Sequence, residues 1–207
     1  MLSISMRLRL IWVRTSRAIV ALIAMMASSA AFAGPMMTGG VTSQPIGHYE
    51  FCQGNRAECS VRSARRAPVS MTAELWEALI KISASVNAAV TPMSDLEIYG
   101  KEEVWAYPVN GVGDCEDYVL EKRRQLHAMG VPLSDLLITV VRKPDGEGHA
   151  VLTVRTSAGD FVLDNLRDDV RSWEKTGYHF LKRQASNHTG RWVSIQHDQQ
   201  VLVGSVQ

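Results

Sequence analysis

The sequence predicts an α+β fold in which one helix packs against an antiparallel β-meander. Two neighbouring patterns lead to this expectation. The stretch GVGDCEDYVLEKRRQL, which begins at Gly111, places apolar residues at helical spacing after a glycine-rich turn. The stretch that follows contains three runs rich in β-forming residues, separated by the turn signals PDGEG and SAGD. A helix that precedes a short meander can cover one of its faces, which defines the fold class.

The predicted helix runs from Cys115 to about Met129. Asp114 is a favourable N-cap residue, and Asp117 lies at the third helical position, where an acid can complete a weaker form of the capping box. Gly130 suits the position just past the helix end, and a proline follows shortly after it. Cys115 is therefore expected to be the first residue of the helix.

The predicted strands of the meander are Leu136 to Arg142, His149 to Thr156, and Phe161 to Leu166. His149 opens the second strand, and Asp164 lies near the end of the third. Antiparallel pairing brings these two strand ends to the same edge of the sheet. A bulge in the SAGD turn would shift the register, so the two side chains are expected near one another without a fixed pairing.

The segments on either side of this unit are expected to be structural. The stretch from Met71 to Val90 reads as an amphipathic helix that ends at Thr91-Pro92. Near the C-terminus, RWVSIQ is a candidate strand that returns to the sheet. The residues expected to face inward from the amphipathic helix are Leu75, Leu79, Ile82, Val86 and Val90.

The first 33 residues have the three parts of a secretory signal peptide. Residues 1–33 contain four arginines and no acid, then an apolar run from Ala18 to Ala27, and then small residues at both positions of Ala31-Phe32-Ala33. The apolar run is short for a bilayer span, which takes about 20 residues. We expect cleavage after Ala33, no later membrane span, and an exported protein, most simply in a bacterial periplasm.

Three cysteines in an exported chain leave one thiol unpaired. Cys52 and Cys59 lie close together in the polar stretch FCQGNRAEC, which favours a local disulfide in an oxidising compartment. Two free surface thiols are a weaker alternative outside the cytosol. A metal site is weaker still, because no second close pair supplies further ligands. Cys115 then remains, and such a thiol is buried and inert, paired between chains, or reactive.

The charge balance excludes a nucleic-acid partner. Without residues 1–33 and their four arginines, the remaining 174 residues carry 18 basic and 21 acidic side chains, an ordinary balance for a soluble surface. No basic stripe with interleaved aromatic residues is present. One small basic cluster precedes the amphipathic helix and reads as a solvated face or, alternatively, as a partner surface. Its members are Arg56, Arg62, Arg65 and Arg66.

Cys115 occupies a position that suits a nucleophile. The free N–H groups at a helix N-terminus stabilise a thiolate and can receive an oxyanion that develops on a substrate carbonyl. His149 is the histidine whose strand context lies beside an acid, Asp164, so these two are the candidate base and its orienting residue. The structural alternatives are a small buried cysteine, a surface histidine and a strand-end acid. Trp105 either lines the cleft or belongs to the core.

Several motifs together resemble the bacterial transglutaminase-like cysteine peptidases. GDCEDY opens the helix, GHAVLTV and FVLDNL lie on successive strands, YGKEEVWAYP precedes the cysteine, and the FC…C loop stands near the mature N-terminus. The resemblance covers roughly His48 to Trp192. It implies a papain-like, transglutaminase-like core with a Cys-His-Asp triad. Carried over by motif, Cys115 is the nucleophile, His149 the base and Asp164 the orienting acid.

The same resemblance bears on the acids next to Cys115. Three carboxylates beside a thiolate raise its pKa by like-charge repulsion, so something should offset them. Well-studied members of the family bind Ca²⁺ through acids that flank the cysteine. Asp114 and Glu116 match those positions, and Asp117 is a further possible ligand. Without the resemblance, these acids would be assigned to helix capping.

The resemblance also implies a domain plan and a role. Residues 1–33 are the signal peptide, residues 34–70 an N-terminal segment with the Cys52–Cys59 disulfide, and residues 71–207 the peptidase core. Well-known relatives are periplasmic proteases that cut surface adhesins and are inhibited by an inner-membrane receptor. We therefore expect an exported thiol protease that acts on an envelope or surface protein. A non-catalytic peptide-binding module and a protein-cross-linking acyl transferase are the alternatives.

Overall fold

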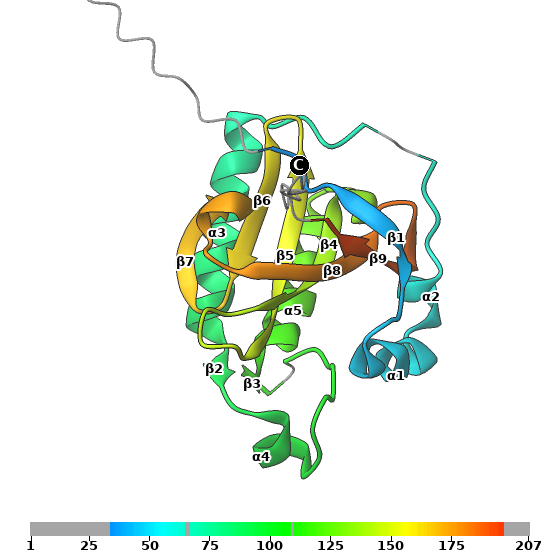
Figure 1. The fold of residues 1–207 in the computed structure, drawn as a ribbon. Helices are drawn as coiled ribbons and strands as arrows, with labels where there is room; N and C mark the ends of the chain where they lie inside the picture. Colours follow the sequence, from blue (N-terminus) through cyan, green and yellow to red (C-terminus); the bar gives the residue numbers. More distant parts are fainter. Residues whose placement is uncertain (1–33, 65–66, 109, 197–207) are drawn as a thin grey trace, which may run out of the picture. The chain divides into compact units, whose positions relative to one another are not determined.

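The computed structural model describes residues 34–64, 67–108 and 110–196, and a seven-stranded antiparallel sheet dominates this part of the chain (Figure 1). The strand order is β1-β9-β8-β4-β5-β6-β7. A small parallel pair, β2 (Thr91–Pro92) with β3 (Val112–Gly113), lies apart from this sheet. The strands of the large sheet are β1 Thr38–Thr42, β4 Leu136–Arg142, β5 Gly148–Thr156, β6 Gly159–Asp164, β7 Arg167–Ser172, β8 His179–Ala185 and β9 His188–Ile195.

Two long helices cover one face of the sheet. Helix α5 (Cys115–Ala128) packs against β4, β5 and β6, and helix α3 (Ala73–Ala89) packs against α5 and β7 (Figure 1). Within the described ranges, no helix has both the length and the apolar character that a bilayer crossing requires. The shorter helices are α1 Ile46–Gly54, α2 Arg56–Cys59, α4 Asp95–Tyr99 and the 3₁₀ turns η1 Leu133–Asp135 and η2 Trp173–Lys175.

The predicted helix and meander are confirmed. Strand β4 has the expected bounds, and β5, β6 and α5 differ from expectation by no more than two residues at each end. Helix α3 begins two residues later than expected, because Thr72 caps it by accepting a hydrogen bond from the backbone N–H of Leu75 (3.1 Å). The expected C-terminal strand is β9. One detail was wrong: Asp114 occupies the N-cap position of α5, but its side chain makes no capping hydrogen bond.

The sheet buries apolar side chains on both faces. Along β5, Leu152 and Val154 point toward α5, while Val151 points to the opposite face, as the two-residue period of a strand requires. The opposite face is covered in part by Met36, which is 4% exposed. Because β1 also pairs with β9, residues from the N-terminal segment are an integral part of the same core.

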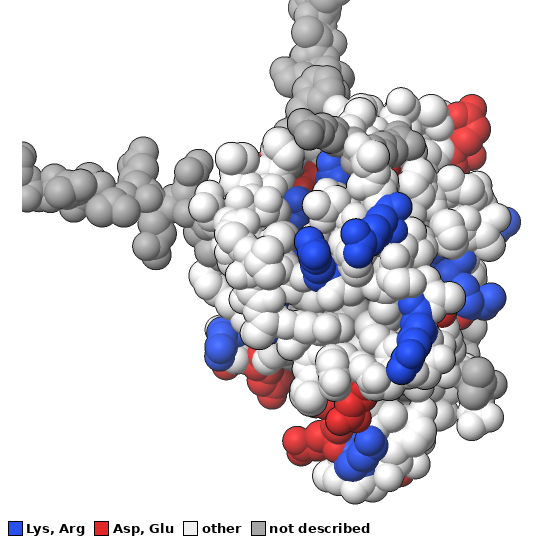
Figure 2. Space-filling view, turned by 90° about the vertical axis from the view of Figure 1, so that its right-hand side faces the viewer, with Lys and Arg blue, Asp and Glu red and all other residues white. Residues whose placement is uncertain are grey.

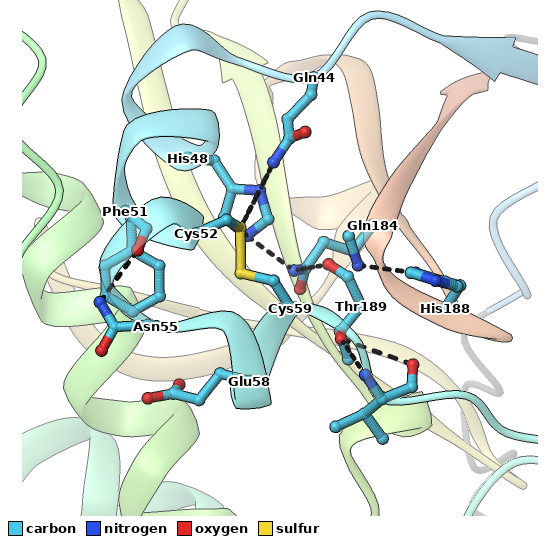
Figure 3. Close-up of a disulfide and its surroundings, with 12 residues drawn as sticks. Gln44, His48, Phe51, Cys52, Asn55, Glu58, Cys59, Gln184, His188 and Thr189 are labelled. Atoms are coloured by element: carbon cyan, nitrogen blue, oxygen red, sulfur yellow. Dashed lines mark hydrogen bonds between the residues drawn. A yellow bond between two sulfur atoms is a disulfide. The ribbon is translucent and has the colours of Figure 1, made fainter.

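Helices α1 and α2 form a small cap that is held by the Cys52–Cys59 disulfide, with a sulfur–sulfur distance of 2.04 Å. Figure 3 shows His48 of α1 beside this disulfide and pointing toward Gln184 of β8. His48 is 1% exposed and packs edge-on against the rings of Trp105 and Trp192 at 5.4 Å each. The cap is therefore fixed to the end of the sheet through a buried histidine.

This buried histidine predicts a loss of stability in mild acid. Burial, aided by the charge of Arg123, lowers the pKa of His48 from 6.5 to about 4. Between these values the unfolded chain binds a proton that the folded chain does not, so stability falls as the pH drops below 6.5. From pH 7.5 to pH 5, His48 is expected to cost the fold about 2 kcal/mol. Urea unfolding of the parent and His48→Gln at both pH values measures this.

The informative quantity is the difference between the parent and His48→Gln in the free energy of unfolding lost from pH 7.5 to pH 5, since acidic groups elsewhere also titrate in this range. His48→Gln should lose about 2 kcal/mol less than the parent over the same interval. His127→Gln, at the exposed end of α5, is the matched control and should behave like the parent. Equal losses for His48→Gln and the parent would contradict the assignment.

The basic side chains of the described residues do not gather into one surface. Figure 2 shows basic side chains scattered singly or in small groups on the face drawn there, with no continuous stripe among the described residues. Arg56 opens α2 and is exposed, and the segment around Arg62 pairs with His188 of β9. Arg65 and Arg66 lie outside the described residues, as does the predicted signal peptide.

Candidate active site

Cys115 is the first residue of α5 and lies in the wall of a cavity of about 590 Å³. The glycine-rich turn before it and the parallel pair β2–β3 set the direction in which the helix begins. The cavity lies between the start of α1 and strands β4 and β5. On the other side, Lys182 of β8 donates a hydrogen bond to the backbone carbonyl of Ser43 (2.9 Å) and so holds the loop before α1 in place. The principal lining residues are Pro45, Ile46, Trp105, Cys115, His149 and Ala150.

His149 and Asp164 meet at the sheet edge where the strand pattern predicted them. His149 Nε2 and Asp164 Oδ1 are 2.9 Å apart, and both side chains are buried. Because Nε2 is engaged by Asp164, Nδ1 is the ring nitrogen left to act on a neighbouring thiol. The same Asp164 oxygen accepts the backbone N–H of Leu166 (3.0 Å), and its other oxygen accepts the hydroxyl of Tyr178 (2.6 Å).

These hydrogen bonds keep the Asp164 carboxylate ionised. Burial alone would raise the pKa of Asp164, but the hydrogen bonds from His149, Tyr178 and Leu166 outweigh it, and the pKa lies below its usual value. A carboxylate that stays charged can hold the imidazole in one tautomer and stabilise its protonated form.

The surroundings of the Cys115 thiol favour its protonated form. Its sulfur donates a hydrogen bond to Glu116 Oε2 (3.0 Å). Burial first, and then the charge and hydrogen bond of Glu116, raise the pKa of Cys115 well above its ordinary value. A hydrogen bond from the backbone N–H of Ala150 acts in the opposite direction. The helix N-terminus therefore does not by itself make this thiol a thiolate, because burial and then the neighbouring Glu116 raise the pKa of the thiol.

A second cluster of acids lies beside the nucleophile's turn. Carboxylate oxygens of Asp95, Asp114 and Asp117 all lie within 4.8 Å of one another. Each residue contributes a buried oxygen with no hydrogen-bond partner in the described structure: Asp95 Oδ1, Asp114 Oδ1 and Asp117 Oδ2. Asp117 uses its other oxygen to accept the backbone N–H of Ala106 (2.8 Å). Burial, despite that hydrogen bond, raises the pKa of Asp117 to about 7.

This donor set fits a calcium ion. Calcium binds oxygen ligands at about 2.4 Å, so two oxygens on opposite sides of the ion stand about 4.8 Å apart. Three unpartnered carboxylate oxygens within that span are costly unless a cation satisfies them. Gly113 lies against the cluster, since a Cβ on it would stand only 2.6 Å from Asp117 Oδ2.

The structure distributes the predicted metal residues over two places. Asp114 and Asp117 join the cluster, together with Asp95 of α4, which no sequence motif indicates. Glu116 lies in the cavity wall, contacts the Cys115 thiol, and also shares a side-chain hydrogen bond with Asp114. Asp95 gave no sequence signal as a ligand because it stands far upstream, in a helix start where acids are common. Tyr178, in the loop before β8, was missed for the same reason of distance.

Trp105 both lines the cavity and belongs to the core. It is 6% exposed, belongs to the main apolar core, and also lines the cavity. Together, a cysteine at a helix N-terminus and a carboxylate-held histidine in one cavity, on a helix-plus-antiparallel-sheet scaffold, define the class of papain-like thiol enzymes.

The comparisons identify the family within this class. The family described as bacterial transglutaminase-like cysteine proteinase BTLCP matches residues 38–200, and the chain belongs to this family of cysteine peptidases. No curated protein matches the sequence. Among solved structures, the fold is similar to Legionella pneumophila LapG, with 26% identity, coverage of 57% of this chain and 67% of that chain, and a TM-score of 0.49. Calcium-bound LapG of the same organism shares 23% identity, covers 62% and 75%, and has a TM-score of 0.50.

Proposed function

We propose that this cysteine peptidase is an exported, calcium-dependent thiol protease in which Cys115 is the nucleophile, His149 the base and Asp164 the residue that orients the base. The observation that carries the proposal is that Cys115 and His149 line one cavity while Asp164 engages Nε2 of His149. This leaves Nδ1 of His149 for the thiol, which is the arrangement that nucleophilic catalysis by a thiol requires.

The reaction follows from these positions. The Cys115 thiol leaves Glu116 and gives its proton to His149 Nδ1, and Asp164 stabilises the resulting imidazolium. The thiolate attacks the substrate carbonyl, and the backbone N–H of Cys115 at the start of α5 receives the developing oxyanion. His149 then protonates the leaving amine as the acyl-enzyme forms. A water molecule, deprotonated by His149, releases the acyl group and regenerates the thiol.

Calcium would be held by Asp95, Asp114 and Asp117. When bound, the ion supplies positive charge that offsets the acids around the thiol. The three unpartnered carboxylate oxygens support this role, and LapG of L. pneumophila has been solved with calcium bound. Glu116 is the remaining candidate from the sequence: it contacts the thiol through Oε2 and also engages the Asp114 side chain, so its carboxylate lies next to the three-acid cluster.

The compartment and the substrate are part of the same proposal. The signal-peptide pattern of residues 1–33, with cleavage after Ala33, supports export to a periplasm, and the Cys52–Cys59 disulfide agrees with an oxidising compartment. An exported protease of this kind acts on an envelope or surface protein, of which an adhesin is one example. An inner-membrane receptor is the proposed regulator, by analogy with relatives in the family.

A paired digestion tests the proposal. The processed protein and its Cys115→Ala variant are incubated with cell-envelope proteins of the source organism, with Ca²⁺ or with a chelator, and new N-termini are mapped. Cuts that require both Cys115 and calcium support the proposal and name the substrate. Cuts that persist in the chelator remove calcium from it. No new N-termini in any sample, with transfer of a labelled amine to protein glutamines, would replace proteolysis by cross-linking.

A further inference from the structure

The Asp164–His149 pair is held by a residue from outside its own strands. The Tyr178 hydroxyl donates to Asp164 Oδ2 at 2.6 Å, and the Tyr178 ring stands edge-on to the His149 ring, with centroids 5.7 Å apart. Tyr178 thus contacts both members of the pair at once. Since His149 and Leu166 engage the other Asp164 oxygen, the hydroxyl of Tyr178 fixes the rotation of the carboxylate.

Tyr178 is the last residue of a short segment, residues 173–178, that is held by hydrogen bonds within itself. We call it the bracing segment. The Thr176 hydroxyl donates to the carbonyl of Trp173 (2.8 Å) and accepts the backbone N–H of Tyr178 (3.2 Å). Gly177 between them has a φ of 77°, which side-chain-bearing residues seldom adopt. These contacts make the position of the Tyr178 hydroxyl depend on where Trp173 is anchored.

One anchor of the bracing segment is Gly34, beside the packing of Trp173 on Phe180. Trp173 Nε1 donates to the carbonyl of Gly34 at 2.8 Å, and the backbone nitrogen of Gly34 donates to Glu174 Oε1 at 3.2 Å. The approach is close: a Cβ on Gly34 would stand 2.7 Å from that Glu174 oxygen. Two reciprocal hydrogen bonds, one in each direction, therefore clamp Gly34 onto η2.

Gly34 is also the residue that follows the predicted cleavage site. Removal of residues 1–33 turns its amide nitrogen into an α-ammonium group, opposite the Glu174 carboxylate. A hydrogen bond between two charged groups is stronger than one between an amide and a carboxylate. Processing would therefore strengthen the contact that holds the bracing segment, without requiring any new position for the chain.

We propose that Tyr178 is a positioning residue for the Asp164–His149 pair, and that the mature N-terminus at Gly34, received by Glu174, holds the bracing segment that carries it. The inference depends on the proposed function, because it assumes that this pair activates Cys115 and that cleavage follows Ala33. It assigns roles to Tyr178, Glu174 and the α-amine that neither the family match nor the sequence motifs supply.

The test uses the exported, processed protein, with its N-terminus verified by mass spectrometry, at saturating calcium. The rate of Cys115 alkylation by iodoacetamide is measured from pH 5 to pH 9, with the thermal midpoint recorded in parallel. Tyr178→Phe removes the hydroxyl and keeps the ring. It should lower the rate near pH 7 by about tenfold, as expected for a lost hydrogen bond to a charged group, and should change the pH dependence. Tyr49→Phe, on the exposed face of α1, is the control and should change neither.

The proposed contact between the α-amine of Gly34 and Glu174 is tested by a double-perturbation cycle. Selective acetylation of the α-amine and Glu174→Gln should each lower the rate by about two- to threefold, the range of an exposed ion pair. Combined, they should cost no more than either alone, because they remove the same contact. Glu77→Gln, at an exposed position on α3, is the matched control.

Three outcomes would overturn the inference: one concerns the role of Tyr178, one the role of the N-terminus, and one the proposed function. An unchanged pH dependence for Tyr178→Phe, even with a lower thermal midpoint, would make Tyr178 merely structural. No effect of acetylation and Glu174→Gln, or effects that add, would remove the N-terminus from the proposal. If Cys115 of the parent fails to react, or its reactivity is untouched by His149→Ala, the proposed function itself fails.

Discussion

Replacing His149 by alanine is expected to lower the rate of proteolysis by about a thousandfold. The Cys115 thiol is protonated and its pKa is raised by burial and by Glu116, so without a base it reacts only as the small thiolate fraction. The measurement is the initial rate at which the new N-termini found in the paired digestion appear, for parent and variant, at saturating calcium. Asp164→Asn should also be severely impaired, since an amide can stabilise the wrong imidazole tautomer.

His127→Ala is the matched control for this prediction. His127 lies on the same helix as Cys115 but at its exposed far end, and should leave the rate within about twofold of the parent, as surface substitutions generally do. Circular dichroism and thermal unfolding separate loss of the base from loss of the fold. A properly folded His149→Ala variant that cleaves at the parental rate would exclude His149 as the base.

Replacing Asp95 by asparagine is expected to weaken calcium binding by about a hundredfold. The substitution removes one negative charge from a cluster of three, and calcium affinity depends on the number of charged ligands. Titration calorimetry of the processed protein with CaCl₂ measures the change directly. Proteolysis by the variant should then require correspondingly higher calcium and recover when calcium is supplied in excess.

The controls for this prediction come from nearby acids. Glu97 lies on the same short helix as Asp95 but bonds to Ser94 in a capping box, so Glu97→Gln should bind calcium like the parent. Glu116→Gln distinguishes the two roles considered for Glu116. Unchanged affinity would assign Glu116 to the thiol, and a loss as large as that of Asp95→Asn would make it a ligand. Parental affinity in Asp95→Asn would remove the cluster from consideration.

The elements of the fold that the sequence predicts are those with a clear local hydrophobic periodicity. Helix α5 and the meander β4–β6 carry strong helical or alternating patterns and clear turn signals. Strand β7, with the sequence RDDVRS, has no apolar alternation, because it is an edge strand whose first half is exposed. Strand β1, TGGVT, owes its existence to pairing with β9 at the far end of the chain. Long-range pairing of this kind leaves no mark on a short segment.

The residues of the candidate site likewise include some that local sequence predicts and some that only the complete fold brings together. His149 and Asp164 were placed together from sequence because strand direction alone brings their ends to one edge. The acids of GDCED were harder to sort, and helix geometry explains why. Asp114 and Asp117 are three residues apart and both reach Asp95, whereas Glu116 lies between the Cys115 thiol and the Asp114 side chain. Tyr178 comes from the loop before β8 and Asp95 from the start of α4, so their positions beside the site depend on the whole fold.

The activity of each molecule is expected to depend on whether the disulfide in the α1–α2 cap has formed. The cap supplies Pro45 and Ile46 to the cavity wall, and closing so short a loop contributes about 2.5 kcal/mol in the chain-entropy view. Under the proposed export, a copy that folds in a reducing cytoplasm would lack the bond and would have a looser substrate wall. Newly made protease would thereby be less able to digest the cell that makes it. The same reasoning advises producing the enzyme in an oxidising host compartment, since material recovered from the cytoplasm would understate its activity.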